Sequence, residues 1–186
     1  LRCLVGSEMC IRDRESMDHL LLHLFFGEDG LFYRRIPTLT RTYYSGSAVM
    51  GSILAALGCE SRKLQEVCDS TDLTPSAASS LLSSLSSHNL VNRIIPVTED
   101  QGSRRTLYEI SDGVFRFWYT FVYPYQSEIE AGMGENIFHR FVSPVLKDWL
   151  KASFEEVCRD FLALEKEMGT APFDFEQIGM WWGQHP

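Results

Sequence analysis

The side chains best suited to contact a nucleic acid are three arginines and a row of serines in the middle of the chain. Arg93, Arg104 and Arg105 lie on two β-rich runs, 90–97 and 104–110, on either side of a polar turn. Guanidinium groups in this position can contact backbone phosphates, and serine hydroxyls can donate to phosphate as well. The preceding helix-forming run offers such hydroxyls at Ser76, Ser79, Ser80, Ser83, Ser84 and Ser87.

The charge balance limits what these side chains can do. Residues 47–110 contain five Lys or Arg against seven Asp or Glu, a net charge of -2, and no Lys or Arg lies between Asp69 and Asn92. Binding strength follows the number of phosphates neutralised, so this segment alone predicts only weak, salt-sensitive DNA binding that depends on Arg104 and Arg105. The whole chain, with a net charge of -8 and a pI near 5.1, excludes a surface that is basic throughout.

Three helices and a hairpin are expected to position these residues. Apolar spacing predicts a helix over 47–57, a short second helix with Ser61 as N-cap, and a third that begins with Thr74 and Pro75. Asn89 would end the third helix in the left-handed conformation, before the two β-rich runs form a hairpin. This order is that of a winged helix-turn-helix over 47–111, which binds DNA or serves as a packing element.

Two other groups of residues could do chemistry. His19 and His23 lie one turn apart on a helix predicted over 16–26, a spacing that can ligate a metal, but no third ligand is near and a half-exposed helix face is the favoured interpretation. Residues 115–125 contain seven aromatic residues, which could stack on bases. With Arg116 as the only charge, a buried connecting helix over 112–136, kinked at Pro124, is favoured.

Apolar spacing in the C-terminal part of the chain predicts two amphipathic helices over 137–164, with Glu155 near the start of the second. The apolar residues at Gly179–Trp182 predict the beginning of a buried strand. By itself Glu155 is a solvated helix carboxylate. No apolar run reaches about 18 residues, so no membrane span is expected. The five cysteines have no CxxC spacing, which favours a reducing, cytoplasmic location.

Both ends of the chain look cut. The first residue is Leu1, and residues 1–14 resemble the translation of a sequencing adapter, so we exclude them from fold reasoning. At the other end the chain stops soon after the apolar pair Trp181 and Trp182. We therefore expect a fragment of a longer protein.

Several segments resemble, in their order along the chain, the C-terminal part of archaeal and bacterial P-loop ATPases of the AAA/STAND type. These proteins carry a winged helix and a C-terminal domain of unknown function related to PD-(D/E)XK nucleases. The resemblance covers about residues 16–186. It rests on Tyr43, Ile53 to Gly58, Leu81 to Leu85, Leu90 to Arg93, Pro96, Tyr108 to Asp112, Phe117 to Val122, Phe154 to Arg159 and Ile178 to Trp182.

The resemblance implies a mainly α fold with a small β-hairpin, in which the winged helix is followed by the truncated start of an α/β nuclease-like domain over 137–186. It also implies that residues 15–46 are the tail of an ATPase lid and that Glu155 matches the first-helix acid of the nuclease fold. ATP and Mg²⁺ would bind a missing upstream domain, because the chain contains no GxxxxGK[ST] motif and no complete catalytic or metal set of its own.

The expected partners are DNA, bound weakly, and the rest of the longer chain; an oligomer is compatible with the sequence. Two alternatives stay open. The chain could be a stand-alone winged-helix transcription regulator whose C-terminal helices dimerise or bind an effector, or an interaction module that does not bind DNA.

Overall fold

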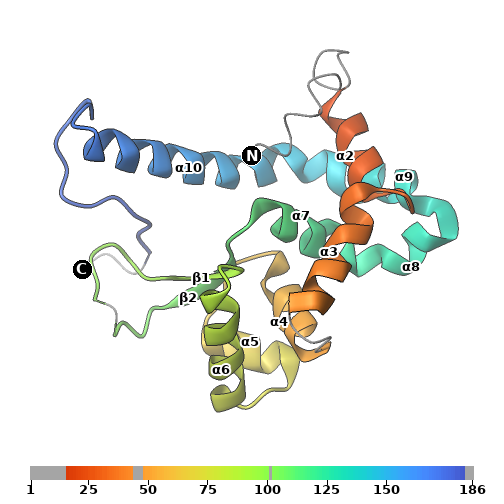
Figure 1. Ribbon diagram of the computed structural model, residues 1–186, viewed down its shortest axis with the longest axis horizontal. Coiled ribbons are helices and arrows are strands. Elements are labelled where there is room, and N and C mark those ends of the chain that lie inside the picture. The colour runs from red at the N-terminus through yellow and green to blue at the C-terminus, as the bar shows by residue number, and fades with distance from the viewer. Residues whose placement is uncertain (1–15, 44–47, 101, 183–186) are drawn as a thin grey trace.

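The N-terminal part of the computed structural model is a pair of helices, α2 (Met17–Phe25) and α3 (Leu31–Tyr43) (Figure 1). The structure describes residues 16–43, 48–100 and 102–182, so the adapter-like residues 1–14 lie outside it. The helix predicted over 16–26 is confirmed as α2, whose N-cap Ser16 accepts a hydrogen bond from the backbone of His19. The sequence patterns did not indicate α3, because it contains Pro37 and several β-branched residues.

A winged helix-turn-helix follows. It consists of α4 (Ala48–Gly58), α5 (Leu64–Thr71), α6 (Pro75–Ser87), and the antiparallel strands β1 (Val91–Ile94) and β2 (Leu107–Ile110). Arg62, just before α5, forms an isolated antiparallel β-bridge to the sheet that the sequence did not predict, since its backbone exchanges two hydrogen bonds with Tyr108 of β2 (2.9 and 2.8 Å). A bridge of one residue gives no alternating pattern to recognise.

The predicted helix ends are partly confirmed. Thr74 caps α6 by accepting from the Ala77 N–H, with Pro75 as the first helical residue, and Asn89 has a φ of 56°. The predicted N-cap at Ser61 is wrong. The cap of α5 is Lys63, whose N–H donates to the Glu66 carboxylate over 2.7 Å, because the backbone of Arg62 is extended and bonded to Tyr108 of β2.

The aromatic segment begins with α7 (Gly113–Phe121), whose first N–H groups are capped by the Asp112 carboxylate. It does not continue to residue 136 as one helix. Pro124 and the positive φ of Gly132 (81°) divide it into short helical turns. These are the 3₁₀ turn Tyr123–Tyr125, α8 (Gln126–Glu128), the π-turn Ile129–Met133, α9 (Gly134–Ile137) and the π-turn Phe138–Val142.

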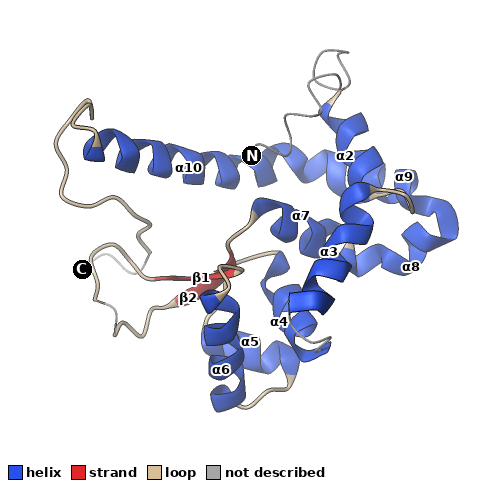
Figure 2. Cartoon of the chain, viewed as in Figure 1, coloured by secondary structure: helices blue, strands red, loops and turns tan. Residues whose placement is uncertain are grey.

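One long helix, α10 (Ser143–Glu167), replaces the two helices predicted in this region. The prediction is wrong because no Gly or Pro interrupts the run after Pro144, so the helix continues past Glu155 without a break. Residues 168–182 form no helix or strand, and Trp181 is 45% exposed, so the buried strand predicted at Gly179–Trp182 is wrong as well. Figure 2 shows the result: the described ranges are mainly helical, with one two-stranded sheet.

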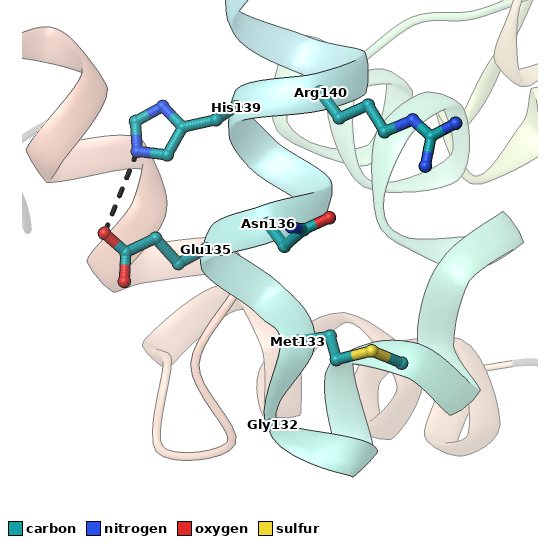
Figure 3. Close-up of a pocket in the computed structure, with 6 residues that line it drawn as sticks. All are labelled: Gly132, Met133, Glu135, Asn136, His139 and Arg140. Atoms are coloured by element: carbon teal, nitrogen blue, oxygen red, sulfur yellow. Dashed lines mark ion pairs between the residues drawn. The ribbon is translucent and has the colours of Figure 1, made fainter.

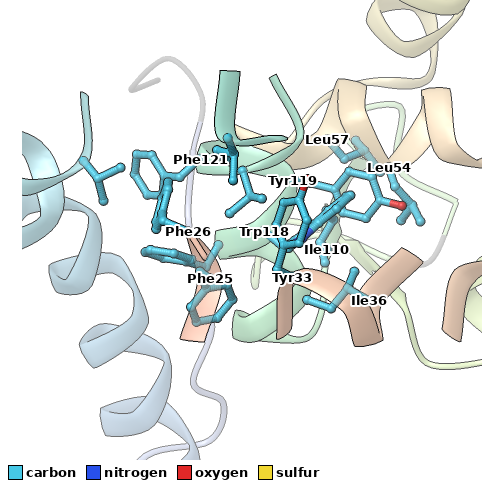
Figure 4. Close-up of a cluster of buried hydrophobic side chains, with 14 of the residues drawn as sticks. Phe25, Phe26, Tyr33, Ile36, Leu54, Leu57, Ile110, Trp118, Tyr119 and Phe121 are labelled. Carbon is cyan, nitrogen blue, oxygen red and sulfur yellow. The ribbon is translucent and has the colours of Figure 1, made fainter. Parts of the chain in front are cut away.

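A continuous hydrophobic core joins these elements (Figure 4). Phe117 of α7 is central to it, with ring centroids 4.6 Å from Phe25 of α2, 5.0 Å from Phe121 and 5.4 Å from Trp149 of α10. Phe117, Trp118 and Tyr119 are each at most 3% exposed, which confirms the interpretation of the aromatic residues as core and leaves these rings unable to stack on bases.

Candidate nucleic-acid interface

The outer face of α6 carries the predicted serine row. Ala78, Leu82 and Leu85 on the inner face are completely buried, and this fixes the rotation of the helix. Of the six predicted serines on the opposite side, five are exposed, including Ser76, Ser79 and Ser80, and Ser84 is half-buried. The face that a winged helix presents to the major groove is therefore open and hydroxyl-rich, and it carries no formal charge.

The wing is the loop between β1 and β2, and its two adjacent arginines, Arg104 and Arg105, have different surroundings. Arg105 is half-exposed, and its Nη1 lies 2.9 Å from the Glu99 carboxylate. The backbone N–H of Arg105 donates to the Ser103 hydroxyl. Arg104 is exposed and makes no ion pair with any residue in the described part of the chain. The charge of Arg104 is thus available to a phosphate, whereas the charge of Arg105 is already matched by a carboxylate.

Arg93 lies on β1 and is exposed. Its Nη2 donates to the Thr106 hydroxyl across the hairpin over 3.2 Å. Arg62, beside the same sheet, is paired with Glu60 at 3.3 Å. Among the described arginines of the winged helix, the exposed Arg104 is therefore the best-placed phosphate contact.

A contact that the sequence did not predict holds the wing in place. The chain after α10 returns to the hairpin (Figure 1), where the Val97 N–H donates to the Met180 carbonyl at 2.9 Å. The Trp182 indole N–H donates to the Arg105 carbonyl over 3.1 Å. These bonds join residues more than 75 positions apart, and no local pattern could have indicated them.

An ionic junction lies between α7 and α10. The Arg116 guanidinium on α7 contacts Glu156 at 3.4 Å and the Ser153 hydroxyl at 2.9 Å, both on α10. Glu109 of β2 is close to this cluster. Burial raises the pKa of Glu109, an effect that Arg116 opposes and Glu156 reinforces.

The remaining candidate residues are not brought together into a catalytic set. Glu155 is exposed on α10, and His19 and His23 are exposed on α2. In the ranges that the structure describes, no three His, Cys, Asp or Glu side chains are grouped so that they could hold a metal ion. The role of Glu155 as a nuclease-like acid stays a prediction.

Two hollows lie outside the winged helix. The first, of about 680 Å³, is formed by the turn around Gly132 and by Glu135 and His139, which lie 3.9 Å apart, with Met133, Asn136 and Arg140 (Figure 3). The second, of about 350 Å³, is an apolar groove between α2, α7 and α10. Neither contains a nucleophile beside a base or a group of metal ligands.

None of the helices in the described ranges is both long and apolar enough to cross a bilayer.

Comparison with known proteins matches the C-terminal part of the chain to a family. Residues 118–186 match the DUF234 family. That family is described as archaeal and bacterial proteins of unknown function. An uncharacterized protein of Methanocaldococcus jannaschii is 28% identical over 169 residues, which cover 91% of this chain and 34% of the relative. The chain therefore spans about a third of the length of the curated relative that it matches.

Three solved structures superpose partially. Lactococcus lactis ZitR is 17% identical, with 60% of this chain and 75% of that chain covered at a TM-score of 0.36. Bordetella bronchiseptica BpsR, whose DNA binding is regulated by 6-hydroxynicotinic acid, is 16% identical (77% and 94% covered, TM-score 0.35). The transcriptional regulator SlyA is 12% identical (70% and 91% covered, TM-score 0.34). The winged-helix assignment here rests on the topology from α4 to β2.

Proposed function

We propose that residues 48–111 are a DNA-binding winged helix that presents α6 to the major groove and the wing to the phosphate backbone. The observation that carries this proposal is the open outer face of α6, fixed by the completely buried Ala78, Leu82 and Leu85, within a complete winged-helix order from α4 to β2. A winged helix used only for packing would be expected to cover that face. Here its serine hydroxyls are exposed.

The charges of the module make this binding weak and mainly nonspecific. Arg93 and Arg104, both exposed, supply the phosphate contacts, and Arg105 contributes less because Glu99 neutralises it. With about two phosphates neutralised, the affinity falls with salt at a log–log slope near -2. The serines position the helix but lack the bidentate geometry that reads a particular base.

The test is a fluorescence-anisotropy titration of a short DNA duplex with the full chain at several salt concentrations. Arg104→Ala is expected to lower the affinity and to reduce the magnitude of the salt slope by about one. Arg34→Ala is the matched control, because Arg34 lies on α3 and is already paired with Asp29 at 2.6 Å. Absence of binding at low salt, or a slope unchanged in the Arg93→Ala/Arg104→Ala double variant, would contradict the proposal.

We further propose that this module works within a longer P-loop ATPase that acts on nucleic acid, with ATP and Mg²⁺ bound by a domain outside the present sequence. The resemblance of residues 16–186 supports this, as does a relative about three times as long as the matched segment. The coding sequence on either side tests it. A phosphate-binding loop is expected upstream, and an Asp followed by Glu-x-Lys downstream, where a nuclease-like domain would be completed.

The coding sequence and the DNA titration together distinguish the two alternative functions. A start codon close to Ser16 and DNA binding that needs no ATP would favour a stand-alone regulator. Failure to retain DNA at low salt would favour an interaction module.

A further inference from the structure

The outer part of α10 has an apolar stripe that the described part of the chain leaves uncovered. Phe154 is 69% exposed, Val157 62% and Phe161 57%, although side chains of this size are normally buried when a helix packs on a core. We name this surface the α10 stripe. It consists of Leu150, Phe154, Val157, Phe161, Leu164 and Met168.

The spacing of the α10 stripe is that of a two-helix seam. Its members are separated by four, three, four, three and four residues, the alternation that keeps one row of apolar side chains facing a partner helix in a coiled coil. The stripe is distinct from the side of α10 that meets the rest of the molecule. That side is occupied by Trp149, Ser153 and Glu156, which contact residues of α7.

We propose that α10 pairs with α10 of a second copy of this chain in an antiparallel helix pair. In this register Leu150 lies opposite Met168 of the second copy, Phe154 opposite Leu164, and Val157 opposite Phe161, so every member of the stripe meets an apolar side chain. The seam is about 27 Å long, at about 1.5 Å per helical residue. It continues into the apolar groove between α2, α7 and α10, because Leu150 also lines that groove.

The charges beside the stripe favour the antiparallel orientation. Lys151 flanks the start of the stripe and Glu165 its end, so an antiparallel pair brings each Lys151 next to Glu165 of the second copy. A parallel pair would instead bring Asp160 next to Glu165, two like charges, and would leave Lys151 without an acidic neighbour across the seam. Of the acidic residues beside the stripe, only Asp160 meets its own copy in the antiparallel pair, near the two-fold axis.

The first test is sedimentation equilibrium of the full chain from about 1 to 100 µM, a range in which a dimer held by one helix pair is expected to be concentration-dependent. Phe161→Glu is expected to raise the dissociation constant at least about 100-fold, since it places a charge in the seam. Glu155→Gln, also exposed on α10 but off the stripe, is the control and should not change it. Circular dichroism checks that each variant keeps its helix content.

The second test concerns orientation. Lys151→Glu and Glu165→Lys are each expected to weaken the dimer by about tenfold, and the double charge exchange to restore it to within about threefold. Asp160→Asn should strengthen it, because the like charges at the axis are removed. Cys158 lies close to the axis in the antiparallel pair, so a short bismaleimide should cross-link two copies when Cys3, Cys10 and Cys59 are replaced by serine.

A chain that stays monomeric at about 100 µM, the top of that concentration range, would overturn the proposal. The α10 stripe would then be assigned to another occupant, such as the remainder of a longer protein. A dimer unaffected by Phe161→Glu would overturn it as well. A charge exchange that fails to restore association would contradict the antiparallel orientation.

Discussion

Arg116 and Glu156 join α7 to the long C-terminal helix. The guanidinium Nη2 of Arg116 on α7 lies 3.4 Å from the Glu156 carboxylate on α10, and the guanidinium carbon lies 5.5 Å from the centre of the Trp149 ring. Arg116 is the only charged residue of α7, and its side chain is only 16% exposed. The pair therefore holds α10 at a fixed place against the aromatic core.

A double-mutant cycle should measure this coupling. Arg116→Ala and Glu156→Ala are each expected to destabilise the protein, with a coupling energy of about 1 kcal/mol, because the pair is partly shielded from water and Arg116 also binds Ser153. Arg34 and Asp29 form a control pair whose side chains are 65% and 95% exposed, and its coupling should be below about 0.5 kcal/mol. Equal couplings in urea denaturation would refute the structural role of the Arg116 pair.

Glu109 should make stability depend on pH. Since burial raises its pKa in the folded state, the stabilisation from its neutral carboxyl is fully present below the ordinary pKa of glutamate and is lost as the pH rises through the raised value. Glu109→Gln is therefore expected to be more stable than wild type at neutral pH and equal to it near pH 3, about where both states are protonated. Denaturant unfolding at both pH values measures this, with exposed Glu167→Gln as the control.

Replacing either of two glycines of α4 by alanine should change the stability of the protein, but in opposite directions. A Cβ on Gly58 would lie 2.9 Å from backbone atoms of Tyr119, so Gly58→Ala must push α4 away from α7 and should cost about 1–3 kcal/mol. A Cβ on Gly51 meets nothing within 4 Å. Gly51→Ala is expected to stabilise the helix by up to about 1 kcal/mol. Thermal unfolding of both variants tests the close approach of the two helices.

Glu99 should weaken the binding of DNA to the wing. Glu99→Gln removes the carboxylate beside Arg105, so the affinity for duplex DNA is expected to rise and the salt slope to steepen by about one. Asp29→Asn changes the net charge of the chain by the same amount in the turn before α3, outside the winged helix, and should have a much smaller effect. If Arg105→Ala in the Glu99→Gln background leaves the gain intact, the explanation is wrong.

Local patterns predicted the elements that local physics controls. The apolar spacing of the third helix, its Thr74 cap and the left-handed Asn89 determine α6 and the start of the hairpin without help from distant residues. The concentration of aromatic residues in 115–125 likewise identified a buried segment. The patterns failed for α3 and for the continuous α10. In α3, contacts of Tyr33 and Ile36 with the core override the unfavourable residues around Pro37.

By itself, the sequence determined a mainly helical chain with a winged-helix order, an uncharged serine face on α6 and few cations, because helix period, caps and net charge are properties of residues near one another. Only the tertiary structure decided which of those cations are available. Glu99 lies beside Arg105, and Trp182 contacts the same residue from far along the chain, while Arg104 stays exposed. The folded chain also left the α10 stripe uncovered, since burial depends on which surfaces meet in space.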